Sequence, residues 1–190
     1  MREILITDKE YDKLIKRLEF FDTMRNNLLT FSFTSVLTVL GVALAIDMDS
    51  ISAWICLIPF FLIIPFTARI SYYRLASAHI NSFLKKFIQM DMQFELSTNV
   101  VSEGKCKHYK LIAWLINHEM VLLGVATSCT FYFKYVFTVE EWLVWNYISL
   151  IVPLVLIIIV YIIADSTYSY KELMDNFSND WDVYINKEAE

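Results

Sequence analysis

The sequence predicts an all-α membrane protein, a single domain of four transmembrane helices in two hairpins with helical cytoplasmic extensions. Three observations predict this fold. Of the 190 residues, 57% are hydrophobic and 19% are charged, which is not the composition of a soluble domain. Three Gly and three Pro are too few for the turns of a β structure, so long helices are expected. The charged residues also leave four long gaps, and a helix needs about 20 apolar residues to cross the hydrocarbon of a bilayer.

The first segment, residues 1–26, is predicted to be an amphipathic cytoplasmic helix. The sequence from Thr7 to Glu10 has the form of a capping box, and apolar residues follow at helical spacing as far as Phe21. We expect a helix from about Asp8 that runs directly into the first span. Charged and apolar positions alternate over residues 2–25, which is not the pattern of a secretory signal peptide.

Spans are expected at about residues 27–46, 51–69, 111–135 and 142–164. The third span is interrupted by His118 and Glu119, which leaves two registers open. The helix crosses either from Leu111 to Phe133 or from about Met120 to Phe137. In the second register, Lys134 extends its ammonium group outward to the interface.

The orientation follows from the basic residues, because Lys and Arg in short loops stay on the cytoplasmic side. Six lie before the first span, seven between the second and third spans and two after the fourth, which leaves only Lys134 of the sixteen on the other side. We therefore expect a multi-pass protein of the bacterial inner membrane with both termini in the cytoplasm. Its net charge of −5 argues against nucleic acid as a partner.

Residues 70–110 are predicted to extend the second span as a cytoplasmic helix that ends near Thr98, with a turn over residues 99–104. This segment is basic, whereas the cytoplasmic tail, residues 165–190, carries seven acidic and two basic residues. Opposite charges favour docking of the tail on the central helix, in the same chain or in a neighbouring subunit. The alternative is that both are solvated faces. The basic residues expected to contact the tail or a cytoplasmic protein partner are Arg69, Arg74, Lys85 and Lys86.

Two sets of residues within the spans are candidate functional sites. His118 and Glu119 are ionisable, and such groups are costly inside a membrane unless they face a bundle interior or water. They are candidates for a proton- or cation-interacting point in a pore, or else they lie at the cytoplasmic interface. The second set consists of small and hydroxylated residues at helical spacing, for which helix packing is favoured over pore lining. Its members are Thr30, Thr34, Thr38, Gly41 and Ala45 in the first span and Gly124 and Ser128 in the third.

Catalytic chemistry has little support. Arg74 and His79 form an Arg-x4-His sequence that resembles the pair used by HEPN-type ribonucleases. Residues five apart on a continuous helix point about 140° away from each other, so these side chains do not converge without a helix break. No phosphate loop, zinc cluster or nucleophile elbow is present, and three cysteines at unpaired spacings predict no disulfide. We expect no enzyme activity, no cofactor and no metal.

The layout of about the first 100 residues is similar to that of SLATT-type membrane proteins of bacterial conflict systems and of small membrane accessory proteins beside CRISPR effectors. The likeness lies in a capped helix ending at Arg25, a tight pair of spans and a helical extension that begins with Arg69–Arg74. The second pair of spans departs from the two-span SLATT pattern. The resemblance implies an antiviral defence role for a homo-oligomer that forms a pore or disturbs membrane lipids, under the control of cytoplasmic helices. The alternative is a non-conducting scaffold that recruits a protein partner.

Overall fold

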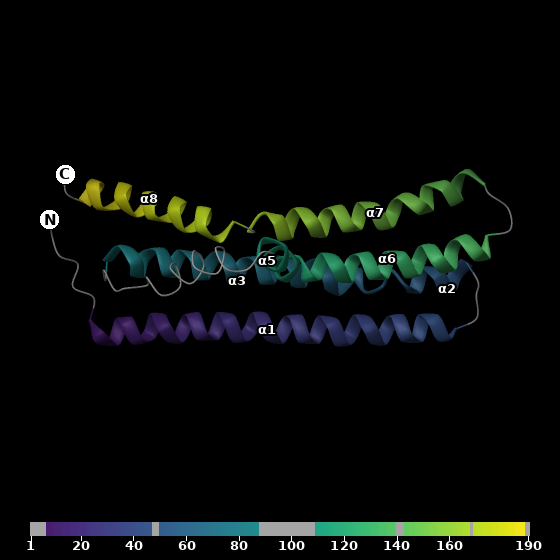
Figure 1. The fold of residues 1–190 in the computed structure, drawn as a ribbon, viewed down its shortest axis with the longest axis horizontal. Coiled ribbons are helices and arrows are strands. Elements are labelled where there is room, and N and C mark those ends of the chain that lie inside the picture. Colours follow the sequence, from purple (N-terminus) through teal and green to yellow (C-terminus); the bar gives the residue numbers. More distant parts are fainter. Residues whose placement is uncertain (1–6, 47–49, 88–108, 140–142, 168, 189–190) are drawn as a thin grey trace. The chain divides into compact units, whose positions relative to one another are not determined.

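The computed structural model describes residues 7–46, 50–87, 109–139, 143–167 and 169–188. Over these residues every regular element is a helix and there is no strand, which confirms the predicted all-α class. The helices are α1 (Asp8–Ala45), α2 (Ser50–Ile55), α3 (Phe60–Phe87), α5 (Tyr109–Asn117), α6 (Glu119–Thr138), α7 (Val144–Asp165) and α8 (Tyr170–Glu188) (Figure 1).

Four helical stretches are long and apolar enough to cross a membrane, which confirms the number of apolar segments predicted from the charge gaps. They are Asp8–Ala45, Ala53–Lys86, Glu119–Thr138 and Val144–Asp165. The third stretch begins after His118, which corresponds to the second of the two registers left open above. The preceding residues form the separate helix α5 instead of the start of a longer span.

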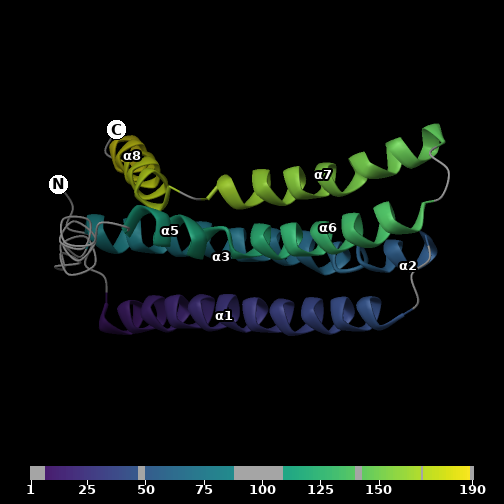
Figure 2. The ribbon, with the colours of Figure 1, turned by 45° about the vertical axis from the view of Figure 1, so that its right-hand side comes forward.

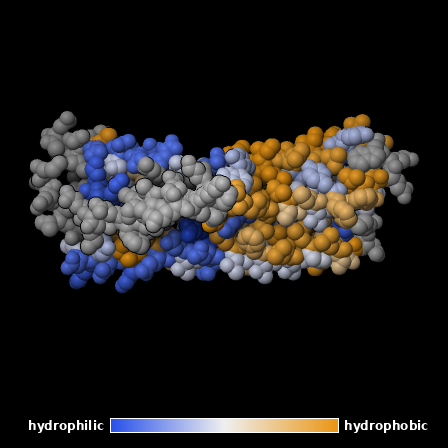
Figure 3. All heavy atoms as spheres, in the orientation of Figure 1, coloured by the Kyte–Doolittle hydropathy of each residue, from blue (hydrophilic) through white to orange (hydrophobic). Residues whose placement is uncertain are grey.

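The chain divides into two compact units. The apolar unit comprises Arg25–Ser71 and His118–Ser166, and the polar unit comprises Met1–Met24, Tyr72–Asn117 and Thr167–Glu190. In Figure 3, the visible surface of α6 and α7 is covered largely by hydrophobic residues. The three segments of the polar unit nearly coincide with the segments 1–26, 70–110 and 165–190 that the sequence predicts to be cytoplasmic.

Helix α1 begins with the predicted capping box. The Thr7 main-chain N–H donates to Glu10 Oε2 over 3.1 Å, and the Glu10 N–H donates to Thr7 Oγ1 over 3.4 Å. The Glu10 carboxylate thus satisfies the N–H of Thr7, whereas the Glu10 N–H also donates to the Thr7 main-chain carbonyl over 2.9 Å. The helix then continues without interruption to Ala45, as expected for an amphipathic helix that runs into the first span.

The apolar unit has a hydrophobic core and also a hydrophobic exterior. Val36 of α1, Ile63 of α3, Phe131 of α6 and Val160 of α7 are fully buried in the core. On the outside, large apolar side chains such as Phe61 are exposed by as much as 82%. A water-soluble monomer rarely exposes apolar side chains on this scale.

Aromatic contacts and hydrogen bonds join neighbouring helices of the apolar unit. Helices α6 and α7 lie side by side (Figures 1 and 2), and the Tyr132 hydroxyl on α6 donates to the Leu150 carbonyl on α7 over 2.7 Å. The Trp54 ring of α2 packs edge-on against Phe131 of α6, with ring centroids 5.4 Å apart. Phe31 of α1 packs against Phe66 of α3, with ring centroids 5.8 Å apart.

The second apolar segment, predicted as one span over residues 51–69, contains a break between two helices. Residues 56–59 form a turn between α2 and α3, and the Cys56 N–H donates to the Ala53 carbonyl, three residues back, over 3.0 Å. Pro59 has no N–H to offer, so the chain cannot continue the regular hydrogen bonding of an α-helix there. Pro65 and Pro153, in contrast, lie inside continuous helices.

The polar unit contains α1 as far as Met24, the second half of α3, and helices α5 and α8. Helix α3 continues past Ser71 to Phe87, as predicted for a cytoplasmic extension of the second span. The predicted end near Thr98 and the turn over residues 99–104 lie outside the described residues.

Candidate functional site

The first candidate site is a stripe of small residues on α1, which we call the α1 stripe. It consists of Thr30, Thr34, Thr38, Gly41 and Ala45, and all five are exposed. At about 100° per residue they fall within about 80° of the helix circumference. The buried residues of this part of α1 lie on roughly the opposite side; they include Ser32, Val36 and Ala43. The stripe therefore faces away from the core of its own apolar unit.

The threonine hydroxyls of the α1 stripe donate to their own helix. Thr30, Thr34 and Thr38 each donate to the carbonyl four residues earlier, at 3.0, 2.9 and 2.8 Å. Their only hydroxyl proton is therefore used within α1, and the face presents methyl groups and oxygen lone pairs. Such a face packs closely against another helix without leaving a donor unsatisfied.

The two glycines that the sequence grouped together as packing residues differ in the structure. A Cβ atom added at Gly41 would meet nothing within 4 Å, whereas one at Gly124 would lie 3.3 Å from Phe60 Cε1. Gly124 thus allows α6 to approach α3 closely inside one chain, and nearby Ser128 is buried with its hydroxyl donating to the Gly124 carbonyl over 2.9 Å. Only Gly41 is available for a contact outside its own chain.

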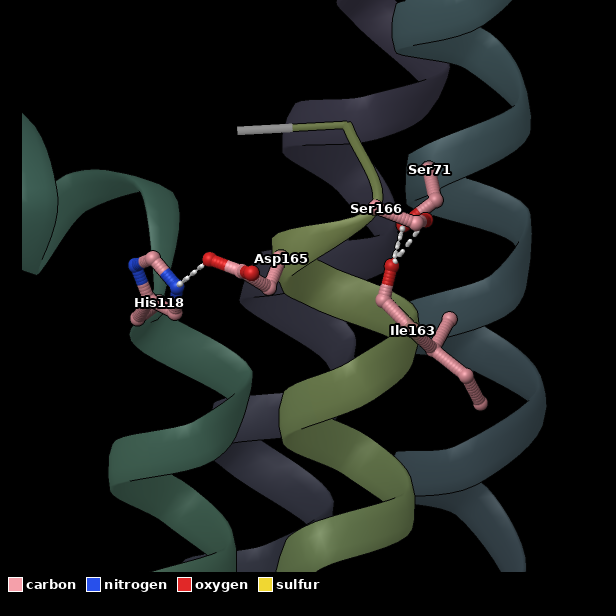
Figure 4. A network of polar contacts seen from close by, with 5 residues as sticks. All are labelled: Ser71, His118, Ile163, Asp165 and Ser166. Atoms are coloured by element: carbon pink, nitrogen blue, oxygen red, sulfur yellow. Dashed lines mark hydrogen bonds and ion pairs between the residues drawn. The ribbon is translucent and has the colours of Figure 1, made fainter. Parts of the chain in front are cut away.

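His118, the second candidate, is fully buried at the junction of α5 and α6, where it occupies the N-cap position of α6. Its Nε2 lies 3.7 Å from Asp165 Oδ1, at the last residue of α7 (Figure 4). The imidazole also stacks on Tyr161, with ring centroids 5.6 Å apart and planes at 24°. The structure therefore brings together a histidine and a carboxylate that are 47 residues apart in the sequence.

His118 and Asp165 both lie at helix ends. His118 precedes the first residue of α6 and Asp165 is the last of α7, while Glu119 lies partly buried in the first turn of α6. An anionic side chain is stabilised at a helix N-terminus, which accounts for Glu119 at this place. None of the three lies in the middle of an apolar helix, where an ionisable group would most strongly indicate a conduction path.

A second polar contact lies next to this pair on α7. The Ser71 hydroxyl of α3 and the Ser166 hydroxyl both donate to the Ile163 carbonyl, over 3.1 and 2.7 Å (Figure 4). That carbonyl is among the last four of α7, which have no partner within the helix. Side chains from α3 and from the following turn thus complete the end of α7.

Lys134 is a buried cation that the sequence analysis placed differently. Its side chain is fully buried, and the ammonium group donates to the main-chain carbonyls of Ala43 and Ile46, the latter over 3.0 Å. The sequence prediction had this group extending outward to the interface. It instead satisfies carbonyls at the C-terminal end of α1, where the helix dipole favours a positive charge. The only signal in the sequence was its position as the one basic residue on the side predicted to be outside.

The third candidate site is a contact between α3 and α8 in the polar unit. Lys86 forms an ion pair with Asp182, so one of the four basic residues proposed for interaction does meet the acidic tail. The other three also lie on α3, where Arg69 and Lys85 are exposed and Arg74 is partly buried. The tail therefore docks on the central helix within one chain, which is one of the two arrangements that the charges suggested.

Aromatic rings take part in the α3–α8 contact. Trp181 of α8 stacks on His79 of α3, with centroids 5.1 Å apart and planes at 11°, and Phe177 lies 4.9 Å from the same imidazole. Trp181 also packs against Phe83 at 5.2 Å, and its Nε1–H donates to the Ser82 hydroxyl over 3.3 Å. This cluster was not predicted, although the apolar spacing of Met174, Phe177 and Trp181 in the sequence is that of one helix face.

This contact also bears on the Arg-x4-His sequence. Helix α3 is continuous from Phe60 to Phe87, so it has no break that would turn Arg74 and His79 toward each other. His79 lies against two aromatic rings of α8 instead. No group of three His, Cys, Asp or Glu side chains within the described ranges could hold a metal ion.

Comparison with models of protein families, with curated proteins and with solved structures finds no match for this chain.

Proposed function

We propose that the chain is a four-span protein of the bacterial inner membrane, with both termini in the cytoplasm, that forms a homo-oligomer through the α1 stripe. In this proposal the oligomer opens a pore or disturbs the integrity of the membrane. The helices of the polar unit lie in the cytoplasm and control it. The observation that carries the proposal is the exposure of the α1 stripe on the side of α1 opposite its buried residues.

Membrane insertion is supported by the outside of the apolar unit. Exposed leucine, isoleucine, valine and phenylalanine side chains cover it, and no bilayer-sized apolar surface of this kind is stable in water. Trp145 and Tyr147 are exposed near the start of α7, where aromatic side chains suit the headgroup level. Lys and Arg of the segments 1–26, 70–110 and 165–190 support a cytoplasmic polar unit through the retention of positive charge on that side.

Assembly through α1 is supported by the relief of the α1 stripe. In lipid, helices associate by close van der Waals contact, because lipid tails are as apolar as leucine and give no hydrophobic driving force. Small residues allow that contact, and Gly41 has open space where a Cβ would be. Thr34 and Thr38 add methyl groups and satisfied hydroxyls to the same face. A second copy of α1 can thus approach closely without loss of a hydrogen bond.

A conducting path would have to form between subunits. The core of one apolar unit contains fully buried side chains such as Phe131, Ile63 and Val160, so we place the conducting path between subunits rather than through one chain. In a ring of subunits, the threonine oxygens of the α1 stripe supply acceptors along the apolar length of α1. In this proposal part of the α1 stripe packs against the next subunit and part of it lines the path between subunits.

The second candidate function is a non-conducting membrane scaffold that recruits a protein partner. It is favoured by the donation of the hydroxyl protons of Thr30, Thr34 and Thr38 within α1, which suits helix packing better than a water-filled lumen. Under this alternative the α1 stripe still mediates assembly, and the basic and acidic surfaces of the polar unit bind the partner.

The two candidates are separated by measuring mass and leakage with the same protein. We expect the purified chain to be an oligomer in detergent by light scattering and to release a small dye from vesicles of bacterial lipid. Gly41→Leu should weaken both, because it adds four carbons to the α1 stripe. Val42→Phe is the matched control, since it adds four carbons to a neighbouring residue that is 54% exposed and lies off the stripe.

An oligomer that leaves vesicles tight would support the scaffold and contradict the pore. A monomer that leaves them tight would contradict both, and equal effects of Gly41→Leu and Val42→Phe would show that assembly does not use the α1 stripe.

A further inference from the structure

Helix α5 exposes apolar side chains although it belongs to the polar unit. Leu111, Leu115 and Ile116 are 56%, 38% and 58% exposed. Among the α5 side chains that the structure describes, every exposed one is apolar. On α8, in contrast, Val183 is the one apolar residue among the exposed side chains described. The exposed side of α8 is thus that of a helix in water, whereas the exposed side of α5 is not.

The exposed residues of α5 form one side of the helix. At about 100° per residue, Leu111, Leu115 and Ile116 fall within about 140° of its circumference. Trp114 and Asn117 are half-buried and lie within about 60° of each other on the opposite side. One side of α5 therefore packs on the protein. The other is a surface of three large aliphatic side chains, Leu111, Leu115 and Ile116, which we call the α5 face.

The chain itself places the end of α5 at the edge of the apolar unit. Helix α5 ends at Asn117, and the next residue, His118, is the N-cap of α6. Glu119 follows in the first turn of α6, and the exposed apolar residues of α6 begin with Leu122, which is 42% exposed. Ionisable groups such as His118 and Glu119 are costly in hydrocarbon, so in an inserted chain they mark its boundary. The last residue of α5 therefore lies at the level of the lipid headgroups.

We propose that the α5 face binds the surface of the lipid bilayer, so that α5 is an interfacial helix that joins the polar unit to the cytoplasmic leaflet. This inference rests on the membrane insertion of the proposed function. The nine residues of α5 rise about 14 Å, which is too short to cross the hydrocarbon, so the helix lies in the headgroup layer. Trp114 flanks the α5 face, and tryptophan suits the headgroup level. The apolar side of such a helix lies about 5–10 Å into the boundary between headgroups and acyl chains.

Lipid fits the α5 face better than a protein partner does. A specific protein interface combines an apolar centre with a polar rim that carries hydrogen bonds. None of the exposed α5 side chains that the structure describes carries a hydrogen-bonding group. Acyl chains need no such group, and the apolar surface that starts on α5 continues in the chain with the exposed Leu122 and Val125 of α6. The α5 face is therefore an extension of the surface that the apolar unit presents to lipid in the proposed function.

Spin labels on the full-length chain test the proposal. The chain carries Cys56→Ala, Cys106→Ser and Cys129→Ser, so that a nitroxide reagent reacts only with an introduced thiol. Ile116→Cys places the label on the α5 face, and Leu111→Cys gives a second position on the same face. Each labelled protein is inserted into vesicles of phosphatidylethanolamine and phosphatidylglycerol. Collisions of the label are then measured with oxygen, which concentrates in hydrocarbon, and with a nickel chelate that stays in water.

Two control positions have nearly the same exposure as Ile116. Val183 of α8 is 54% exposed and Leu154 of α7 is 53% exposed, compared with 58% for Ile116. A label at Val183→Cys should report water, and one at Leu154→Cys should report hydrocarbon. We expect the ratio of oxygen to nickel collisions at Ile116→Cys to be about tenfold above that at Val183→Cys and below that at Leu154→Cys, because the α5 face lies only in the boundary layer. Leu111→Cys should give the same result as Ile116→Cys.

Each other outcome contradicts the proposal in a distinct way. If both α5 labels match Val183→Cys while Leu154→Cys lies in hydrocarbon, α5 is in water, and the inference fails although the proposed function stands. If both α5 labels are shielded from oxygen and from nickel, protein covers the α5 face, either another part of the chain or a second copy, and lipid binding is again contradicted. If Leu154→Cys also collides mainly with nickel, the chain is not inserted, and the proposed function fails together with the inference.

Discussion

The ammonium group of Lys134 on α6 donates a hydrogen bond to the main-chain carbonyl of Ile46, 3.0 Å away, just beyond the last residue of α1. A second bond runs from the same group to Ala43. The end of a helix leaves carbonyls without partners, and in an apolar surrounding each such group is costly. Lys134 therefore joins α6 to the end of α1 by satisfying both.

We expect Lys134→Met to destabilise the apolar unit by about 1–3 kcal/mol, because it keeps the length of the side chain and removes the donor. Lys134→Arg keeps a donor and a positive charge and should lose less. Thermal unfolding in detergent, followed by circular dichroism, measures both. Replacement of a buried cation by an apolar residue can also stabilise a protein, so an unchanged or higher midpoint for Lys134→Met would contradict the role of this bond.

Substitutions at the two glycines should separate contacts within the chain from contacts outside it. Gly124→Ala places a Cβ 3.3 Å from Phe60 Cε1, so the ring must shift by a few tenths of an ångström, and this substitution should be less favourable for stability than Gly41→Ala. Gly41→Ala meets nothing within 4 Å and should stabilise a single chain by about 0.5–1 kcal/mol, because alanine favours the helical backbone over glycine. Thermal unfolding in detergent and the oligomeric mass, measured on the same samples, check both expectations. A loss of stability from Gly41→Ala in monomeric protein would show that this position packs against its own chain, which would contradict the structure.

The contact between His118 and Asp165 should contribute little to stability despite the burial of the imidazole. The Asp165 side chain is 49% exposed and the atoms are 3.7 Å apart, so solvent screens the pair. A double-mutant cycle with His118→Ala and Asp165→Ala should give a coupling below about 1 kcal/mol. His118→Ala alone should cost about 2 kcal/mol or more, because it leaves a cavity beside Tyr161. A coupling well above 1 kcal/mol would indicate that the pair is shielded from water.

Trp181 should control the docking of α8. Trp181→Ala removes its ring contacts with His79 and Phe83 and should make α8 accessible to limited proteolysis, whereas Trp181→Phe keeps a ring and should protect it in part. Val183→Ala is the control, because this neighbouring side chain is 54% exposed. Hydrogen exchange of α8 gives the same information without a protease. Equal protection in Trp181→Ala and in the unmodified chain would show that other contacts hold α8.

An even number of spans places both ends of the chain on one side of the membrane. Reporter fusions after residues 26 and 190 should both be active as cytoplasmic fusions, and a fusion after residue 140 should be active only on the outside. Carbonate washing should leave the protein in the membrane pellet. An external carboxyl end would remove one of the four spans and with it the proposed cytoplasmic position of the polar unit.

The pattern of charges and apolar residues was sufficient to predict the long helices. The capping box at Thr7, the continuous α1 and the extension of α3 past Ser71 follow from local spacing, because hydrogen bonds within a helix and the exclusion of charge from apolar stretches act over a few residues. The four apolar helices follow from the same pattern, since their length depends on composition alone.

The partners of individual side chains were decided only by the tertiary structure. Whether Gly41 and Gly124 have open space or the Phe60 ring beside them depends on how the helices pack, and the sequence pattern does not distinguish the two glycines. The pairing of Lys134 with Ile46 joins residues 88 positions apart, and that of Trp181 with Ser82 joins residues 99 apart. Hydrophobicity and charge determine which segments are helical and apolar, but the rotation and approach of each helix follow from the fit of side chains that only the fold brings together.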